Sequence, residues 1–187
     1  MTTLYEITAL SEFLSKHPQD HVSKTLSSFS CNRDKDVESF LKEKAIVQER
    51  KHISRTYLIF TAGPGSELVA YFTIAINSMD VTDLECSNEL RKKMNINRGL
   101  AQSYLIGQIG KRDGSERGLG KLAILHAIGL LRGVNLKVGC RVIRVDCKPS
   151  LVKYYADNGF IHVGRNKDGD LDQMIQIIDA RTAAPSL

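Results

Sequence analysis

Long hydrophobic runs are missing from this sequence of 187 residues. The longest strongly apolar stretch, residues 119–131, contains Lys121 and His126 and is shorter than the roughly 20 residues that a membrane-spanning helix needs. The start of the chain also lacks the basic segment and apolar core of a secretory signal peptide. We therefore expect a soluble, cytoplasmic protein without a membrane partner.

Cysteine is scarce and its spacing is irregular. The absence of a Cys-x-x-Cys pair argues against a disulfide framework and predicts free, mostly buried thiols at Cys31, Cys86, Cys140 and Cys147. His17 and His21 could share one helical face, but Pro18 lies between them and no Cys or acidic partner stands at a ligand spacing. We therefore expect no metal centre.

Charge of one sign is only slightly in excess. Lys and Arg number 26 and Asp and Glu number 21, so the formal net charge is +5. This excess permits a polyanionic partner such as a nucleic acid or a phosphorylated cofactor, but a solvated basic surface is the commoner explanation. Hydrophobic residues at 42% and charged residues at 25% are ordinary globular values, and the length suits one domain over residues 1–187.

The first half of the chain predicts strands and helices that precede any β-α-β unit. Residues 4–8 alternate like a short strand, and Ser11 is a suitable N-cap for a short helix after it. Further along we expect a helix at 36–50 capped by Asp34, strands at 55–61 and 67–76 joined by a Gly-Pro-Gly-Ser turn, and a polar segment at 77–99 with one helical turn at 88–94.

The second half predicts one β-α-β unit, then a helix and a final hairpin. The expected elements are a strand at 103–111, a helix that ends near Arg132 before Gly133, a strand at 141–146, a helix at 150–157 between Pro149 and Asn158-Gly159, and strands at 160–163 and 173–178 around a turn at 166–170. This order of elements is that of a mixed α/β fold.

The segment 112–121 is the most informative part of the sequence, because it joins a strand to a helix and is rich in glycine. Backbone N–H groups at a helix N-terminus are unpaired and carry the positive end of the helix dipole. Glycines there let a phosphate approach closely, which suits a phosphorylated ligand. A plain strand-to-helix turn that needs glycine for its dihedral angles explains the segment equally well.

Two nucleotide-binding signatures fit this segment poorly. The P-loop pattern, aligned on Gly120-Lys121, has Ser115 at its first glycine and Leu122 at its hydroxyl position, which disfavours ATP or GTP hydrolysis. The dinucleotide pattern is matched by Gly118, Gly120 and Ala123, and Asp146 stands where a ribose-binding acid is expected. Because residues 112–117 separate the strand from the first glycine and only one β-α-β unit is visible, a dinucleotide-binding oxidoreductase is also disfavoured.

A third signature fits better. Ser115-Glu-Arg-Gly118-Leu-Gly120 follows Gln/Arg-x-x-Gly-x-Gly/Ala, the pyrophosphate loop of acetyl-CoA enzymes, except that Ser115 replaces the usual Gln or Arg. Downstream, Tyr154-Tyr155-Ala-Asp-Asn-Gly159-Phe160 resembles the aromatic-Tyr-x-x-x-Gly-Phe signature of the GNAT acetyltransferase superfamily. Within that superfamily the toxin-type branch is the most similar, through Phe29-Ser-Cys31 and the segments at 37–45, 54–57 and 68–71.

The resemblance implies a fold, a cofactor and a reaction. The fold would be α/β, a single domain with a mixed, mostly antiparallel central sheet and helices on both faces. The reaction would be N-acetyl transfer from acetyl-CoA to a primary amine, in the toxin branch that of aminoacyl-tRNA. The implied partners are the amine acceptor, an antitoxin protein and a second copy in a homodimer. A small amine, an amino acid or a peptide N-terminus is an alternative acceptor, and a non-catalytic CoA-binding module is an alternative function.

Carried over by position, the resemblance also assigns site residues. Backbone groups of Ile109 and Lys111 would contact the acetyl and pantetheine groups, and Tyr155 would donate a proton to the departing thiolate. The pyrophosphate would be wrapped by the main-chain N–H groups of Glu116, Arg117, Gly118, Leu119, Gly120 and Lys121. For a general base the sequence offers Glu67, Glu85 and His126, but none is convincing, because each is better explained as a surface carboxylate or a packed histidine.

Overall fold

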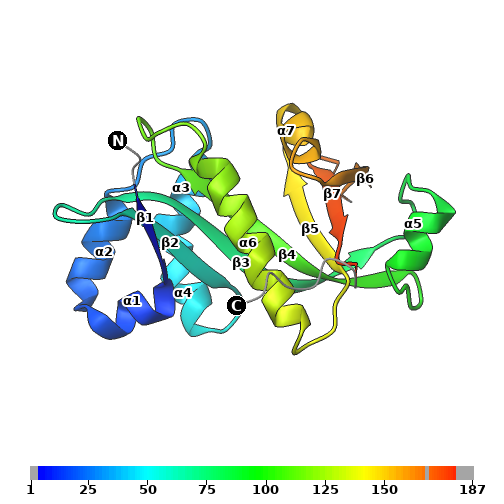
Figure 1. Cartoon of the computed structure of the whole chain (residues 1–187), viewed down its shortest axis with the longest axis horizontal. Coiled ribbons are helices and arrows are strands. Elements are labelled where there is room, and N and C mark those ends of the chain that lie inside the picture. The colour runs from blue at the N-terminus through cyan, green and yellow to red at the C-terminus, as the bar shows by residue number, and fades with distance from the viewer. Residues whose placement is uncertain (1–3, 167–168, 180–187) are drawn as a thin grey trace. The chain divides into compact units, whose positions relative to one another are not determined.

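Seven strands form a mixed sheet in the order β1-β2-β3-β4-β5-β7-β6 in the computed structural model of the chain, which describes residues 4–166 and 169–179 (Figure 1). The chain divides into two compact units. Unit 1 comprises residues 1–75 and 108–127, and unit 2 comprises residues 76–107 and 128–187. Three elements run through both units: β3 (Leu68–Asp80), β4 (Leu100–Lys111) and α6 (Leu119–Asn135).

Unit 1 begins with an antiparallel ladder of β1 (Tyr5–Ala9), β2 (Arg55–Thr61) and the first part of β3. Tyr5 pairs with Thr61, and Tyr57 pairs with Phe72. The predicted hairpin between β2 and β3 is confirmed, and its turn contains Gly63 at φ +97°. Such a positive φ is open to glycine at little steric cost, which explains this residue in the turn.

Helices cover both faces of this ladder. One face carries α1 (Leu10–Lys16), α2 (Gln19–Ser27) and the helical run of α3 (Lys35–Ser39), the π-helical η1 (Phe40–Lys44) and α4 (Ala45–Arg50). Their shared core with β2 and β3 contains Leu10, Phe13, Val22, Leu26, Phe29, Leu41, Ala45, Leu58, Phe60, Leu68 and Tyr71. The N-terminal half of α6 lies on the opposite face, in front of β3 in Figure 1.

The helices of unit 1 confirm one sequence prediction and correct another. The helix expected at 36–50 is present and Asp34 caps it, although five of its residues are π-helical. The helix expected after a Ser11 N-cap begins two residues earlier, so that Ala9 occupies the N-cap position and Ser11 lies in the first turn. α2 was not predicted, because only Val22 and Leu26 of its nine residues are buried and apolar and its apolar pattern is therefore weak.

Unit 2 is built around β5 (Val142–Cys147). β4 pairs with it in parallel from Ser103↔Val142 to Ile106↔Val145, while β7 (Asp172–Ile177) pairs with it antiparallel and β6 (Ile161–Arg165) forms the edge beyond β7. The helices are α5 (Asn88–Lys93), the 3-10 turn η2 (Pro149–Leu151) and α7 (Val152–Ala156). The core contains Met79, Val81, Leu84, Leu90, Met94, Ala101, Val142, Val163 and Ile175.

Most predicted boundaries in unit 2 are close, and the departures have simple causes. α6 continues through Gly133 to Asn135, because Gly133 does not adopt the positive φ of a helix-ending glycine. β3 extends to Asp80 and β4 begins at Leu100, so the expected polar segment is shorter, and α5 confirms its helical turn. Part of the expected turn at 166–170, residues 167–168, lies outside the described residues.

Two general expectations can be compared with the described residues. All four cysteines are free, and Cys31, Cys140 and Cys147 are buried while Cys86 is partly exposed, as predicted. Among the helices in the described part of the chain, none has the length and apolar character needed to cross a bilayer.

Candidate active site

The glycine loop of unit 1 joins the end of β4 to the start of α6. Gly118 has φ +95° and its carbonyl accepts the first intrahelical hydrogen bond, from the Leu122 N–H at 3.0 Å. Helix geometry therefore leaves the N–H groups of Leu119, Gly120 and Lys121 without partners inside the helix. These three groups point along the positive end of the helix dipole, as an anion site requires.

The Lys111 side chain holds this loop from the end of β4. Its Nζ donates to the Ser115 carbonyl at 2.7 Å and to the Glu116 carbonyl at 3.1 Å. The Ser115 hydroxyl in turn donates to the Arg112 carbonyl at 2.5 Å. Side chains of Lys111 and Ser115 therefore bind main-chain carbonyls within the loop and hold its shape.

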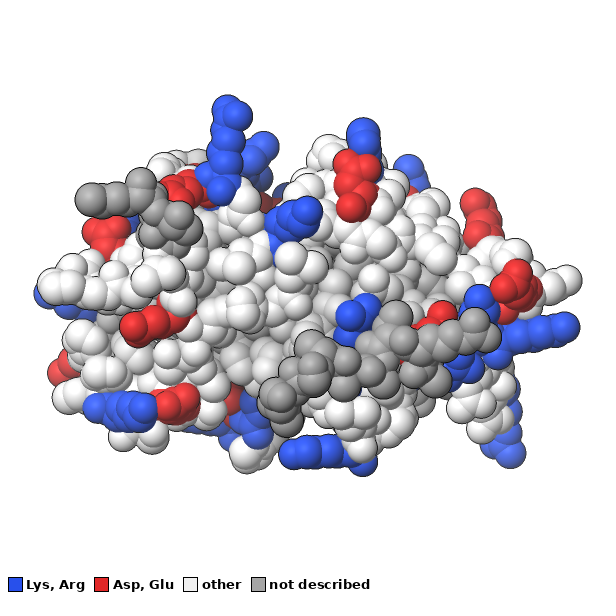
Figure 2. All heavy atoms as spheres, viewed as in Figure 1, with Lys and Arg blue, Asp and Glu red and all other residues white. Residues whose placement is uncertain are grey.

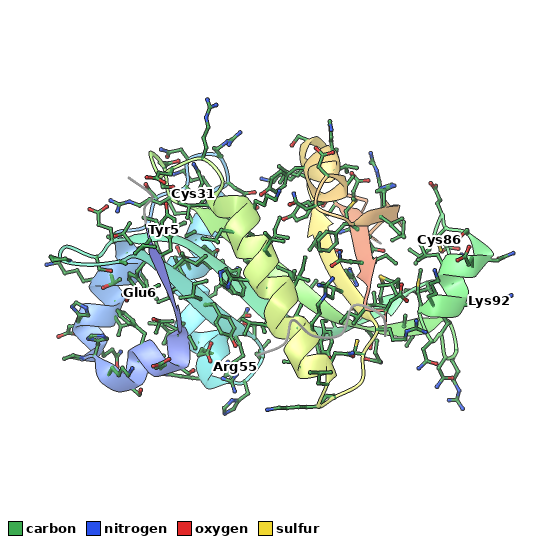
Figure 3. The ribbon with its side chains drawn as sticks, in the orientation of Figure 1. Tyr5, Glu6, Cys31, Arg55, Cys86 and Lys92 are labelled. Atoms are coloured by element: carbon green, nitrogen blue, oxygen red, sulfur yellow. The ribbon has the colours of Figure 1, made fainter. Side chains whose placement is uncertain are left out.

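Contacts to other elements of unit 1 fix the same loop from outside. The Arg112 N–H donates to the Val69 carbonyl of β3 at 2.8 Å. The Asp113 carboxylate accepts the Asn32 N–H at 3.1 and 3.0 Å. The Tyr5 hydroxyl donates to Glu116 Oε2 at 3.0 Å. Tyr5 lies on β1 and is labelled in Figure 3.

The end of β4 is positioned by a close approach at Gly110. A Cβ added there would lie 2.7 Å from Val37 Cγ1 and would also overlap the Tyr71 ring. Tyr71 is fully buried, and its hydroxyl donates to the Val37 carbonyl at 2.5 Å. Side chains of α3 and β3 therefore pack directly against the β4 backbone at Gly110, where the absence of a Cβ leaves room for them.

The donor set of the loop fits a pyrophosphate. Main-chain N–H groups at a helix start supply neutral donors, and the exposed Arg117 and Lys121 add positive charge beside them. Gly114 and Gly118 have positive φ, and a Cβ added at either would meet no atom within 4 Å, so the space over the loop is open. The loop could therefore bind the phosphates of a CoA molecule. Ile109, like Lys111, lies half-buried near the end of β4.

Tyr155 lies in unit 2, in the last turn of α7. Its ring packs edge-on against Phe160 with centroids 5.7 Å apart, and against Tyr154 at 5.5 Å. The Tyr155 carbonyl accepts the N–H groups of Asn158 and Phe160 across a turn that contains Gly159 at φ +86°. The side chain is 8% exposed, and this burial, together with the nearby Cys147 and Tyr154, raises the pKa of its phenol. A phenol in this setting stays protonated at neutral pH, as a proton donor must.

The structure places the three candidate bases in unlike settings. Glu67 is exposed and pairs with Arg112 at 3.0 Å, and His126 is exposed on α6. Glu85 lines a cavity of about 420 Å³ in unit 2, next to α5 and the start of β6. None of the three is held by a buried partner in the described chain, so the geometry does not single out one of them.

Sequence reasoning missed several residues that shape these two regions. In unit 1 the anchors Tyr5, Asn32 and Asp113 carry no motif, and they meet only because distant segments fold together. In unit 2 the cavity also contains His162, whose Nε2 lies 2.8 Å from the buried Asp172 carboxylate. A His-x(9)-Asp spacing across a hairpin is too common to have signalled this pair.

Comparisons with known proteins place this architecture in a fold class. Neither a protein-family model nor a curated protein matches the sequence. Solved structures do match: the chain shares the fold of KacT and AtaT, with likenesses that cover 90% or more of its length. The predicted mixed, mostly antiparallel α/β fold is therefore confirmed.

Three of these structures define the likeness. A tyrosine-to-phenylalanine mutant of KacT has a TM-score of 0.73 at 19% identity, over 92% of this chain and 94% of that one. AtaT complexed with acetyl-methionyl-tRNAfMet has a TM-score of 0.71 at 19% identity, over 90% of this chain and 94% of that one. AtaTR bound with acetyl-CoA has a TM-score of 0.64 at 18% identity, over 92% of each chain. At these identities the likeness shows the fold and leaves the activity to be argued from the residues.

Proposed function

We propose that the chain is an acetyl-CoA-dependent N-acetyltransferase. The observation that carries this proposal is the anchored glycine loop, which presents unpaired N–H groups at the start of α6 beside Arg117 and Lys121. The likeness to AtaTR, solved with acetyl-CoA, supports the same ligand. The other half of the proposal is the buried, protonated phenol of Tyr155.

Acetyl-CoA supplies the activated thioester when it is bound. The N–H groups of residues 116–121 hold its pyrophosphate, and backbone groups of Ile109 and Lys111 orient the pantetheine arm and the thioester carbonyl. Donors that are already in place stabilise developing negative charge without reorganising. As the amine nitrogen bonds to the thioester carbon and the C–S bond breaks, Tyr155 would give its phenolic proton to the departing sulfur. The nitrogen would lose a proton to solvent, and solvent would return one to the phenol. The attacking amine must be neutral, and the amino group of an aminoacyl ester is partly neutral near pH 7.

The cofactor is tested first by thermal unfolding with acetyl-CoA, CoA, NAD and ATP. A ligand that binds only the native state at 100 times its Kd adds about 2.7 kcal/mol to the free energy of unfolding, which is a visible shift in Tm. We expect a shift with acetyl-CoA and CoA alone. A shift with NAD alone, or no shift at all, would overturn the assignment of the glycine loop.

We further propose that the acceptor is the amino group of an aminoacyl-tRNA. The support is the fold likeness to AtaT, whose structure contains acetyl-methionyl-tRNAfMet. The charge pattern neither adds to this nor excludes it. On the face in Figure 2, basic and acidic side chains are both scattered, and basic ones also gather at the lower right. The net charge of +5 is likewise modest.

Acetyl transfer to charged tRNA, to uncharged tRNA and to a panel of small amines and peptides separates the candidate acceptors. The aminoacyl proposal expects acetyl transfer to charged tRNA only. Transfer to a small amine or a peptide N-terminus alone would favour the alternative acceptors. CoA binding without thiol release on any acceptor would favour a non-catalytic CoA-binding module.

We also propose an antitoxin partner, since AtaT has been solved with the antitoxin AtaR. A ribbon-helix-helix type reading frame beside the gene, and co-purification of its product, would be the supporting results. A homodimer remains a prediction, which sedimentation of the purified chain tests directly.

A further inference from the structure

The Lys111 ammonium lies beside the glycine loop but is turned toward its carbonyl groups. A lysine at the edge of a phosphate loop is commonly a direct ligand of the phosphate. Here two of its three N–H donors are already used, by the carbonyls of Ser115 and Glu116 at 2.7 and 3.1 Å. The contact that the structure shows for this side chain is therefore with the protein itself.

These two contacts set the direction of the neighbouring N–H groups. A trans peptide is planar and holds its C=O and the N–H of the next residue in opposite directions. The described chain contains no cis peptide bond. Because Lys111 binds the carbonyls of Ser115 and Glu116, the N–H groups of Glu116 and Arg117 point away from the ammonium.

A second contact fixes the carboxylate of Glu116 to β1. Its Oε2 accepts the Tyr5 hydroxyl at 3.0 Å on the β1 side of the loop. A carboxylate repels a phosphate, so a partner that fixes this side chain to β1 limits how closely its charge can approach a bound anion. The backbone of the preceding residue is also fixed, since the Ser115 N–H and hydroxyl both donate to the Arg112 carbonyl, at 3.3 and 2.5 Å.

We propose that Lys111 is a positioning residue that shapes the pyrophosphate loop through its side chain. Ser115 stands where the acetyl-CoA motif has Gln or Arg and is too short to reach past the loop, whereas Lys111 reaches the loop carbonyls from the end of β4. The inference rests on the proposed function, because it assigns a role within the same CoA site. Loop order that exists before the ligand arrives lowers the ordering entropy lost on binding.

The test compares Lys111→Met, which keeps an apolar stem without the ammonium, with Lys111→Arg, which keeps charge and donors. Lys24→Met is the matched control, since Lys24 is an exposed lysine of α2 in the same unit. The first readout is the backbone order parameter of residues 115–118 by ¹⁵N relaxation without ligand. The second is the Kd for CoA at low and high ionic strength.

We expect Lys111→Met to lower the loop order parameters below about 0.6 while the wild type, Lys111→Arg and Lys24→Met stay near about 0.85. We expect Lys111→Met to raise the Kd for CoA by about tenfold at both ionic strengths, the usual worth of a hydrogen bond from a charged group. Loop order unchanged in Lys111→Met would overturn the proposal. So would a loss of affinity that disappears at high salt, because that result marks a direct charge on the phosphate.

The test also covers a variant that does not fold and a wild type that does not bind CoA. If Lys111→Met does not fold, Lys111→Gln replaces it, because glutamine keeps a polar end but is too short to reach both carbonyls. If the wild type binds no CoA, the proposed function fails, while the order parameters measured without ligand still decide whether Lys111 shapes the loop.

Discussion

At the scale of single residues, burial decides which form Tyr155 takes. The ordinary pKa of tyrosine is about 10. Desolvation by the surrounding side chains, among them Phe160, raises the pKa of this phenol further, and the nearby Cys147 and Tyr154 act in the same direction. The proton donor is therefore present throughout the neutral range and is lost only at strongly alkaline pH. An alkaline decline in turnover that begins below pH 9 must come from another group.

Tyr155→Phe removes the proton donor but keeps the packed ring. We expect it to leave the Kd for acetyl-CoA within a factor of about two and to lower kcat by about 10²–10⁴-fold, the usual worth of general acid catalysis. Tyr154→Phe is the matched control, because this neighbouring phenol is 37% exposed. Steady-state thiol release measures both variants. Equal turnover in Tyr155→Phe and the wild type would remove Tyr155 from the mechanism.

Glu38 shows how a surface carboxylate becomes tied to the fold. It accepts hydrogen bonds from Lys42 Nζ at 2.7 Å, from the Cys31 N–H at 2.9 Å and from Lys35 Nζ at 3.0 Å. These three donors favour the ionised form and lower the pKa of Glu38 from 4.5 to about 2. A group whose pKa is lower in the folded state stabilises the fold above its unfolded pKa, and this stability is lost as the pH falls through the folded value.

Glu38→Gln tests this linkage. We expect the variant to have a lower urea midpoint than the wild type at about pH 7, with the difference shrinking from about pH 4.5 downward and vanishing near about pH 2. Glu43→Gln is the control, because Glu43 is an exposed glutamate of the same helical run. A difference between Glu38→Gln and the wild type that is independent of pH would show that the contact is not ionic in origin.

At the scale of elements, the end of β4 depends on close packing around one glycine. Gly110 lies between the buried ring of Tyr71 and the Val37 side chain, and an added Cβ would have to displace both. Neither neighbour can move freely, because the Tyr71 hydroxyl is bonded to the Val37 carbonyl. The glycine loop that follows therefore has a fixed starting point, and a change at Gly110 should be transmitted to it.

Gly110→Ala is expected to lower the free energy of unfolding by about 1–3 kcal/mol, the range for overpacking a well-filled core. Gly129→Ala is the matched control, since a Cβ added there, in the interior of α6, meets nothing within 4 Å. That control should raise stability by up to about 1 kcal/mol through helix propensity. Urea unfolding measures both. A Gly110→Ala variant as stable as the wild type would show that the Tyr71 ring has room to move.

Whether an element could be predicted depended on where its signal lies. The β2–β3 hairpin is specified by neighbouring residues, two apolar runs around Gly63-Pro-Gly65. Both strands were predicted, β2 at its observed bounds and β3 with an end four residues too early. α2 was missed because its sequence is mostly polar and two buried side chains are enough to attach it to the core. The π-helical turn at Phe40–Lys44 could not be predicted either. A π-helical hydrogen bond spans only one residue more than an α-helical one, so the pattern of apolar residues hardly changes.

At the scale of the whole molecule, the chain passes between its two units inside regular elements. The passages lie within β3, β4 and α6, and none falls in a linker. Neither unit can therefore form its full complement of strands from its own residues alone. If residues 1–187 form one domain, as the sequence predicts, the two units should unfold together in one cooperative transition.

We expect a single unfolding transition in urea, with the same midpoint by circular dichroism and by NMR peak intensities from each unit. Ile175→Val, in the core of unit 2, should cost about 0.5–1.5 kcal/mol and shift the midpoint of the peaks from both units together. Gly110→Ala should do the same from unit 1. Two separate midpoints, each sensitive to only one variant, would show that the units unfold as independent domains.

The sequence by itself determined the features that are encoded by neighbours along the chain. These are the hairpin of β2 and β3, the glycines before α6, and the Tyr155-to-Phe160 segment, whose residues lie within one or two turns of each other. The tertiary structure alone decided how the loop is held. Lys111 was predicted to contact the cofactor through its backbone, whereas the structure shows its side chain bound to the loop. Contacts made by Tyr5, and between Asn32 and Asp113, join the loop to segments far apart in sequence. Such contacts depend on which strands pair, and strand pairing depends on the packing of the whole core. A local sequence pattern therefore could not have predicted them.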